Sequence, residues 1–189
     1  MWGCFPLYWA LLNHVNPSEV LIHRMLWAVP VLFFLVHFKS SWKNNFKKTI
    51  SSKKEIVFLF ITAILITINW GGYIYAVNLG RVVEASMGYF LSPVINMIGG
   101  YIFFQERISK LKQLAVFLAT VGALYYVFSG DSFPWLGFLV GFTFSAYGIA
   151  RKAMASSSVP GLYIETLILL PFLLIFSLWF YTNYDIAFF

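Results

Sequence analysis

The sequence has few charged residues and almost no cysteine. Only 11% of its 189 residues are charged and 60% are hydrophobic, whereas about 25% of the residues of a soluble domain are charged. An ordinary soluble domain is therefore excluded, and the bilayer is the expected solvent. Cys4 is the single cysteine, which excludes an intramolecular disulfide and a cysteine-based metal site.

Acidic and catalytic residues are scarce as well. Seven Asp and Glu stand against thirteen Lys and Arg, and the three histidines are scattered. The chain has no GxSxG, no metal-binding His/Glu spacing and no glycine-rich phosphate loop, so we expect no enzyme, no metal site and no cofactor. The basic residues lie in short segments between apolar runs and form no continuous face, so nucleic acid is not an expected partner.

What the sequence has instead is a series of apolar runs, several of them near the roughly 20 residues that cross a membrane. Residues 1–12 are too few to cross and are interpreted as the second half of a first helix, which predicts a truncated N-terminus. Six full spans are expected at 19–38, 55–79, 85–104, 114–128, 135–150 and 160–181. The predicted fold class is all-α, a polytopic transmembrane helical bundle with one partial and six full spans.

The positions of the basic residues predict the orientation of these spans. Segments 39–54, 105–112 and 151–158 hold eleven Lys and Arg, and the connectors on the opposite side hold only Arg81. Because cytoplasmic loops carry the excess of Lys and Arg, these three segments and the N-terminus are expected in the cytoplasm. Segment 39–54, with six lysines, is predicted to be a polar loop.

The 85–104 span has no formal charge but is rich in small and polar residues. Those at helical spacing along one face are Ala85, Tyr89, Ser92, Pro93, Asn96 and Gly100. Such a face needs water or another helix beside it, so this span is predicted to line a pathway. Tyr89, Pro93 and Asn96 are candidates for a substrate cavity. Asn69 and Tyr73 of the preceding span are assigned to the same cavity or to hydrogen bonds between helices.

Ionisable residues inside a span are unfavourable, so each needs an explanation. Arg24 is open to two interpretations, a snorkelling or ion-paired structural residue or a contact with substrate. Glu165 is a further candidate for the substrate cavity. Glu84 either stabilises the N-terminal end of its helix and pairs with Arg81, or couples transport to protons.

Small residues and one charge pair predict local contacts. Gly137 and Gly141 have the spacing that lets two helix backbones approach closely. Ala115, Ala119 and Gly122 are expected to do the same in their span. Glu106 and Arg107 are expected to pair at a helix end.

Four stretches, Glu19–Phe33, Asn69–Arg107, Tyr147–Lys152 and Tyr163–Pro171, resemble the RarD subfamily of EamA-type transporters in the drug/metabolite transporter superfamily. The resemblance extends over nearly the whole chain. It implies ten helices in two inverted five-helix repeats, with a central cavity lined by the third and fourth spans of each half. Residues 1–129 would form the first repeat and 133–189 the first two helices of the second, so the chain is expected to be a fragment.

The resemblance implies a permease of the bacterial inner membrane that moves a small organic solute by alternating access. Proton coupling is a hypothesis that rests on Glu84 and Glu165. The alternative is a non-transporting helical scaffold or assembly partner, favoured if the polar face of the 85–104 span packs tightly against a helix. The expected partners are membrane lipid, a small-molecule substrate and, as a candidate, a second copy of the chain.

Overall fold

The computed structural model describes residues 11–12, 14–130 and 132–184, and its regular elements there are all helices. They are α2 (Pro17–Phe38), α3 (Ser40–Ile50), α4 (Lys53–Asn78), α5 (Val82–Phe104), α6 (Lys110–Ser129), α7 (Trp135–Lys152) and α8 (Ser158–Asn183). Five of them, α2, α4, α5, α6 and α8, are long and apolar enough to cross a membrane. The predicted all-α membrane bundle is confirmed. Most of the predicted partial helix at 1–12 lies outside the described residues.

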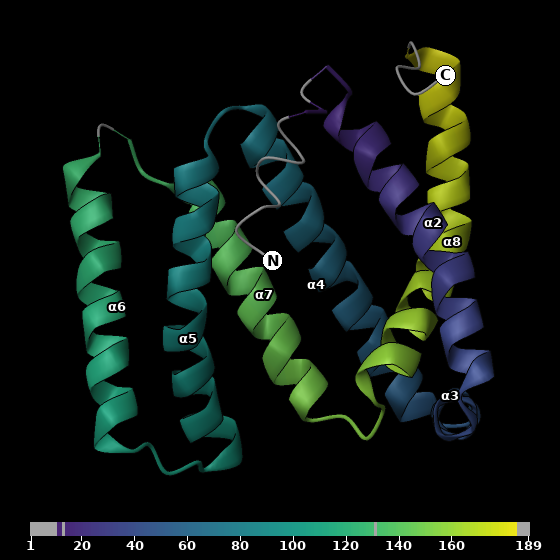
Figure 1. Ribbon diagram of the computed structural model, residues 1–189, viewed down its shortest axis with the longest axis horizontal. Helices are drawn as coiled ribbons and strands as arrows, with labels where there is room; N and C mark the ends of the chain where they lie inside the picture. The colour runs from purple at the N-terminus through teal and green to yellow at the C-terminus, as the bar shows by residue number, and fades with distance from the viewer. Residues whose placement is uncertain (1–10, 13, 131, 185–189) are drawn as a thin grey trace.

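The helix α7 differs from the other predicted spans. It has 18 residues, several of them small or polar, and it ends in Arg151 and Lys152, so it is not apolar enough to be counted among the five. It lies between α5 and α4 (Figure 1), and its buried residues include Gly137, Thr143 and Ser145. Its lower apolarity follows from this position, because its small and polar residues face other helices.

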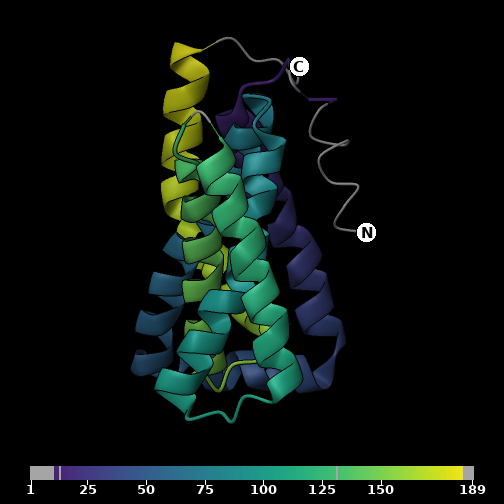
Figure 2. The same cartoon turned by 90° about the vertical axis from the view of Figure 1, so that its left-hand side faces the viewer.

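The helices α6, α5, α7 and α4 lie side by side in that order, and α2 and α8 pack against each other beyond α4 (Figure 1). Seen from the α6 side, the long helices run between the same two ends of the molecule (Figure 2). The connections between them are short. Gly80 makes the tight turn from α4 into α5. Its φ of 72° is a backbone conformation that residues with a Cβ rarely adopt.

One end of the bundle, here called the basic end, holds α3 and the connectors at 105–109 and 153–157 (Figure 1). The three segments that carry eleven of the thirteen basic residues therefore meet at one end. The prediction of a loop at 39–54 is wrong, because α3 occupies most of it. Trp42 and Phe46 are one helical turn apart, and both are half-buried, as is Asn45. These residues give the short helix a face that packs against the bundle and stabilises it.

The closest contact between helices joins α5 to α7. A Cβ atom on Gly141 would lie 2.7 Å from the carbonyl oxygen of Gly88, and one on Gly137 would lie 2.5 Å from that of Glu84. These distances leave no room for a side chain, so the two backbones touch directly. The predicted role of Gly137 and Gly141 is confirmed.

The helix α6 packs far more loosely. Ala123 is its single buried residue, and in the described part of the chain no atom beyond the nearby backbone of α6 itself lies within 4 Å of the position that a Cβ on Gly122 would take. A groove of about 510 Å³ separates the second half of α6 from the first part of α5, in the half of the bundle away from the basic end. The prediction of close contact at Ala115, Ala119 and Gly122 is therefore wrong, since small residues permit a close approach but do not enforce one.

The contrast between Gly88 and Gly122 gives a matched test. We expect Gly88→Ala to destabilise the protein by about 1–3 kcal/mol, because its methyl group would overlap the α7 backbone. Gly122→Ala should leave stability unchanged or raise it, because alanine favours helix and meets nothing there. Unfolding of both variants in detergent micelles measures the difference. Equal stability of the two variants would contradict the contact.

Candidate functional site

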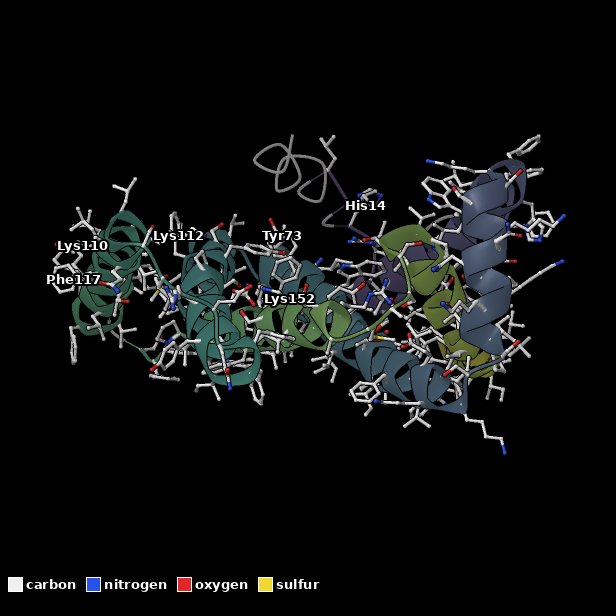
Figure 3. The ribbon with its side chains drawn as sticks, turned by 90° about the horizontal axis from the view of Figure 1, so that it is seen from below. His14, Tyr73, Lys110, Lys112, Phe117 and Lys152 are labelled. Carbon is white, nitrogen blue, oxygen red and sulfur yellow. The ribbon has the colours of Figure 1, made fainter. Side chains whose placement is uncertain are left out.

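A cavity of about 490 Å³ opens between α5, α6 and α7 near the basic end. Its wall includes Pro93 and Asn96 together with Glu106 and three cations, Arg107, Lys112 and Lys152. We call it the cation-lined cavity. Figure 3, a view onto the basic end, shows Lys112 on α6 and Lys152 at the end of α7. Lys152 pairs with Glu106, so the predicted pair of Glu106 with Arg107 is wrong and the wall keeps a net positive charge.

The polar face of α5 divides between this cavity and α7. Ala85, Gly88 and Ser92 are buried, and the Ser92 hydroxyl donates to the carbonyl oxygen of Gly141 at 3.4 Å. Pro93 and Asn96 lie further along the same helix. Both are exposed and line the cavity. The face therefore has both of the neighbours that its composition allows, a helix along one edge and an open space along the other.

Three further candidates lie among aromatic rings. The Arg24 guanidinium carbon is 4.0 Å from the centre of the Trp70 ring, a cation–π contact between α2 and α4. The rings of Tyr73 and Tyr89 are 5.7 Å apart, and that of Tyr89 is 5.6 Å from Phe144. These contacts join α4, α5 and α7. Arg24 thus has an aromatic partner on the neighbouring span.

Asn69 and Glu84 are buried in contacts between helices. The Asn69 side chain is 1% exposed and donates to the Val140 carbonyl oxygen at 2.8 Å and to the Thr143 hydroxyl at 3.2 Å. One Glu84 carboxylate oxygen lies 2.6 Å from Arg81 Nε, and the other accepts from the backbone N–H of Leu136 at 2.8 Å. Glu84 thus caps the first turn of α7, where the N–H groups have no partner within the helix.

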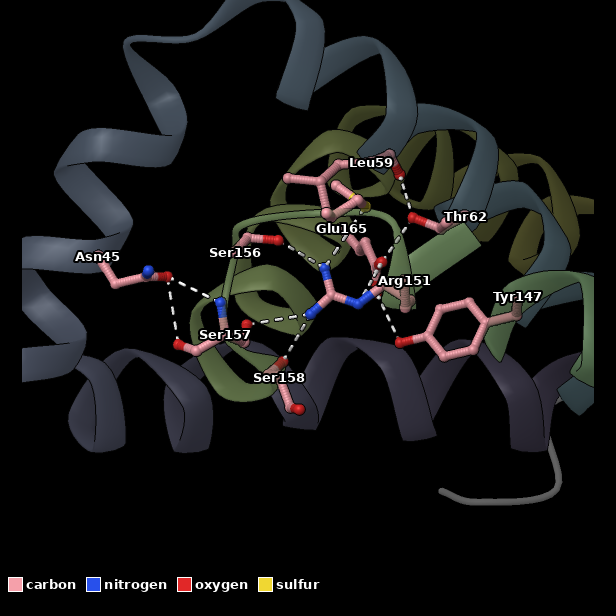
Figure 4. Close-up of polar contacts among 10 residues, drawn as sticks. Asn45, Leu59, Thr62, Tyr147, Arg151, Ser156, Ser157, Ser158 and Glu165 are labelled. Atoms are coloured by element: carbon pink, nitrogen blue, oxygen red, sulfur yellow. Dashed lines mark hydrogen bonds and ion pairs between the residues drawn. The ribbon is translucent and has the colours of Figure 1, made fainter. Parts of the chain in front are cut away.

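Glu165 is the centre of a buried polar cluster (Figure 4). Thr62 of α4 donates to one carboxylate oxygen at 2.6 Å, and Tyr147 of α7 donates to the other at 3.3 Å. Arg151 Nε lies 3.9 Å from the carboxylate. We call these four residues the Glu165 cluster. Glu165 is 1% exposed, and this cationic partner offsets part of the cost of burying its charge.

Arg151 also fixes the connector between α7 and α8. Its guanidinium donates to the Ser156 hydroxyl at 2.9 Å and to the Ser157 carbonyl oxygen at 3.0 Å (Figure 4). A Cβ on Gly161 would overlap this guanidinium, so a larger residue there would require the Arg151 side chain to shift. The basic end of α7 is therefore bound to α8 by one side chain.

The sequence did not point to Thr62, Trp70, Tyr147 or Arg151. Tyr147 and Arg151 are four residues apart, so they share one face of a helix. A tyrosine and an arginine on one face could have indicated a polar contact with another helix. Nothing distinguishes Thr62 from Thr67 in the same span. The eight candidate residues are spread over the cation-lined cavity, the aromatic contacts, the contact of Asn69 with α7, the Glu165 cluster and the far end of α5. In the described residues no three His, Cys, Asp or Glu side chains come together as metal ligands would.

Comparison with known proteins identifies the family. Residues 1–128 match the model of the EamA-like transporter family. The chain belongs to that family. The chain is 37% identical over 173 residues to an uncharacterized transporter, YojE, of Bacillus subtilis, and 36% identical over 171 residues to the protein RarD of Escherichia coli. The resemblance to RarD is confirmed.

Each of these two matches covers 90% of the chain and 58% or 57% of the relative, so the chain spans about three fifths of their length. No solved structure matches the chain. YojE carries a transporter name, and the match to the EamA-like transporter family together with the apolar helices agrees with a multi-pass bacterial membrane protein.

The Glu165 cluster can be tested by a pair of threonine substitutions in α4. Thr62→Val removes a hydrogen bond to a buried carboxylate and should lower the free energy of unfolding by about 1–3 kcal/mol. Thr67→Val is the control, because the Thr67 hydroxyl donates to the carbonyl oxygen of Ala63 in its own helix. Denaturation in micelles measures both. A loss in Thr67→Val as large as that in Thr62→Val would contradict the assignment.

Proposed function

We propose that the chain forms part of a permease that carries a small organic solute across the bacterial inner membrane by alternating access. The cation-lined cavity is the observation that carries this proposal. It holds about 490 Å³, within the range of small-molecule sites. The basic end then lies in the cytoplasm, in accordance with the positive-inside rule.

A contact between α5 and α7 at the opposite end supports an opening of this cavity toward the basic end. There Glu84 joins Arg81 to the first turn of α7, so the ends of α5 and α7 are held together. Movement of solute to that side requires this contact to open. The cavity mouth at the basic end is lined by Arg107 and Lys112, which favours a solute that carries negative charge or strong hydrogen-bond acceptors.

Coupling to protons is a further part of the proposal and rests on Glu84. Protonation of Glu84 would remove the charge that attracts Arg81 and weaken the contact that closes the far end of α5 and α7. A proton taken up there would thereby favour opening. The Glu165 carboxylate, with its three partners, is assigned to holding α4, α7 and α8 together.

Uptake into vesicles tests the proposal. Purified protein in proteoliposomes is exposed to a mixture of small metabolites, and the vesicle contents are measured by mass spectrometry. We expect at least one solute to enter faster than into empty vesicles, and Asn96→Trp to abolish this uptake by filling the cavity. Ile98→Trp is the control, because Ile98 is 51% exposed and does not line the cavity.

The outcomes of this experiment are distinct. Absence of uptake above empty vesicles, or equal loss in the two tryptophan variants, would contradict the permease assignment. An imposed pH gradient should accelerate uptake by the unmodified protein but not by Glu84→Gln. If the gradient has no effect on the unmodified protein, proton coupling is wrong while the permease assignment stands.

A scaffold or assembly role remains the second candidate, and α6 is the observation that favours it. In this helix only Ala123 is buried, and large apolar residues such as Leu111, Phe117 and Tyr125 are exposed. Such a surface suits a second copy of the chain as well as lipid. A stable dimer in native membranes without solute uptake would select this function.

A further inference from the structure

The short helix α3 is oriented differently from the spans. It is seen end-on in Figure 1, where the long helices run up and down, and it extends across the end of the bundle in Figure 3. It begins two residues after Phe38, the last residue of α2. Because α2 crosses the bilayer, a helix that turns sideways directly at its end lies along the membrane surface.

The inner face of α3 is fixed to the protein. The Phe46 ring lies 5.3 Å from that of Tyr163 and 6.2 Å from that of His37. The side-chain oxygen of Asn45 accepts from the backbone N–H of Ser157 at 3.0 Å and from its hydroxyl at 3.2 Å (Figure 4). These contacts define which side of α3 faces away from the bundle.

The outer face carries positive charge that no carboxylate of the described residues offsets in an ion pair. Segment 39–54 contains six lysines and no acidic residue. Among the described residues none of the six forms an ion pair, whereas Lys152 at the same end pairs with Glu106. Lys39 lies over the Trp42 ring, 4.4 Å from its centre. Four to eight basic residues on an amphipathic helix next to a span typically bind anionic lipid.

An exposed apolar side chain accompanies these charges. Lys43, Lys47 and Ile50 are spaced by four and three residues, so they share one flank of α3, and Ile50 is 48% exposed. Two ammonium groups beside an isoleucine suit the boundary between headgroups and acyl chains. A soluble acidic partner would match the charges and leave Ile50 unexplained.

We propose that α3 and its flanking lysines form a binding surface for anionic phospholipid headgroups. The lysine ammonium groups donate hydrogen bonds to the phosphodiester oxygens, and Ile50 contacts the upper acyl chain. The lipid thereby holds α3 against the membrane. Through Asn45 and Ser157 this surface adjoins the connector that Arg151 fixes. The inference concerns a site apart from the cation-lined cavity and stands whether or not the permease assignment does.

Lipid selectivity in bilayers tests the proposal. The full chain is placed in phosphatidylcholine vesicles with trace spin-labelled phosphatidylglycerol or spin-labelled phosphatidylcholine, and electron spin resonance gives their relative association with the protein. We expect the preference for phosphatidylglycerol to fall about threefold to fivefold in the double variant that carries both Lys43→Gln and Lys47→Gln. The control double variant, with Lys110→Gln and Lys112→Gln, removes two charges at the same end of the bundle. It should lower the preference for phosphatidylglycerol by less than half as much.

A gain of charge supplies an independent measurement. Asn44 is exposed on α3, and Asn44→Lys should raise the preference, with the difference lost in 1 M salt because exposed charges are then screened. An unchanged preference in the Lys43 and Lys47 variant would overturn the proposal, as would an equal fall in both double variants. Circular dichroism confirms that each variant is folded.

Discussion

The structure depends on the direct contact between the α5 and α7 backbones. Gly88, Gly137 and Gly141 leave no space between the two helices, and Glu84 caps the start of α7 from α5. In lipid, where apolar side chains gain little from leaving the solvent, close packing and hydrogen bonds between helices supply the association energy. This contact places α7, the least apolar of the long helices, inside the row of helices, where its small and polar residues have partners.

The position of α7 determines where the other features lie. One side of α7 meets α5 and leaves the cation-lined cavity between these two helices and α6. The other side meets α4 through Asn69, and the end of α7 meets α8 through Arg151. Polar residues at the basic end thus belong to two separate arrangements, an open cavity with a positive wall and a closed cluster around Glu165. The first is suited to a solute and the second to holding helices together.

The sequence predicted the membrane class, the helices and the gathering of basic residues at one end, because length, apolarity and charge are properties of single segments. It also predicted the Gly137–Gly141 contact, since that spacing has a known packing consequence. It failed for Gly122, for the loop at 39–54 and for the partner of Glu106. It gave no sign of the partners of Glu165. Each of these depends on which helix lies beside which, and the Thr62–Glu165 contact joins residues 103 positions apart.

A disulfide between α5 and α7 tests the central contact most directly. The Ser145 hydroxyl lies 3.4 Å from the Ser92 carbonyl oxygen, so cysteines at these two positions, with Cys4 replaced by serine, should cross-link in native membranes under mild oxidation. A protease site in the connector between α5 and α6 separates the two cysteines of this pair and of a control pair, and so reveals either link on a gel. The account predicts rapid linkage of Ser92→Cys with Ser145→Cys and slow linkage of Ser86→Cys with Ala119→Cys across the wider α5–α6 groove. Linkage of the second pair but not of the first would contradict it.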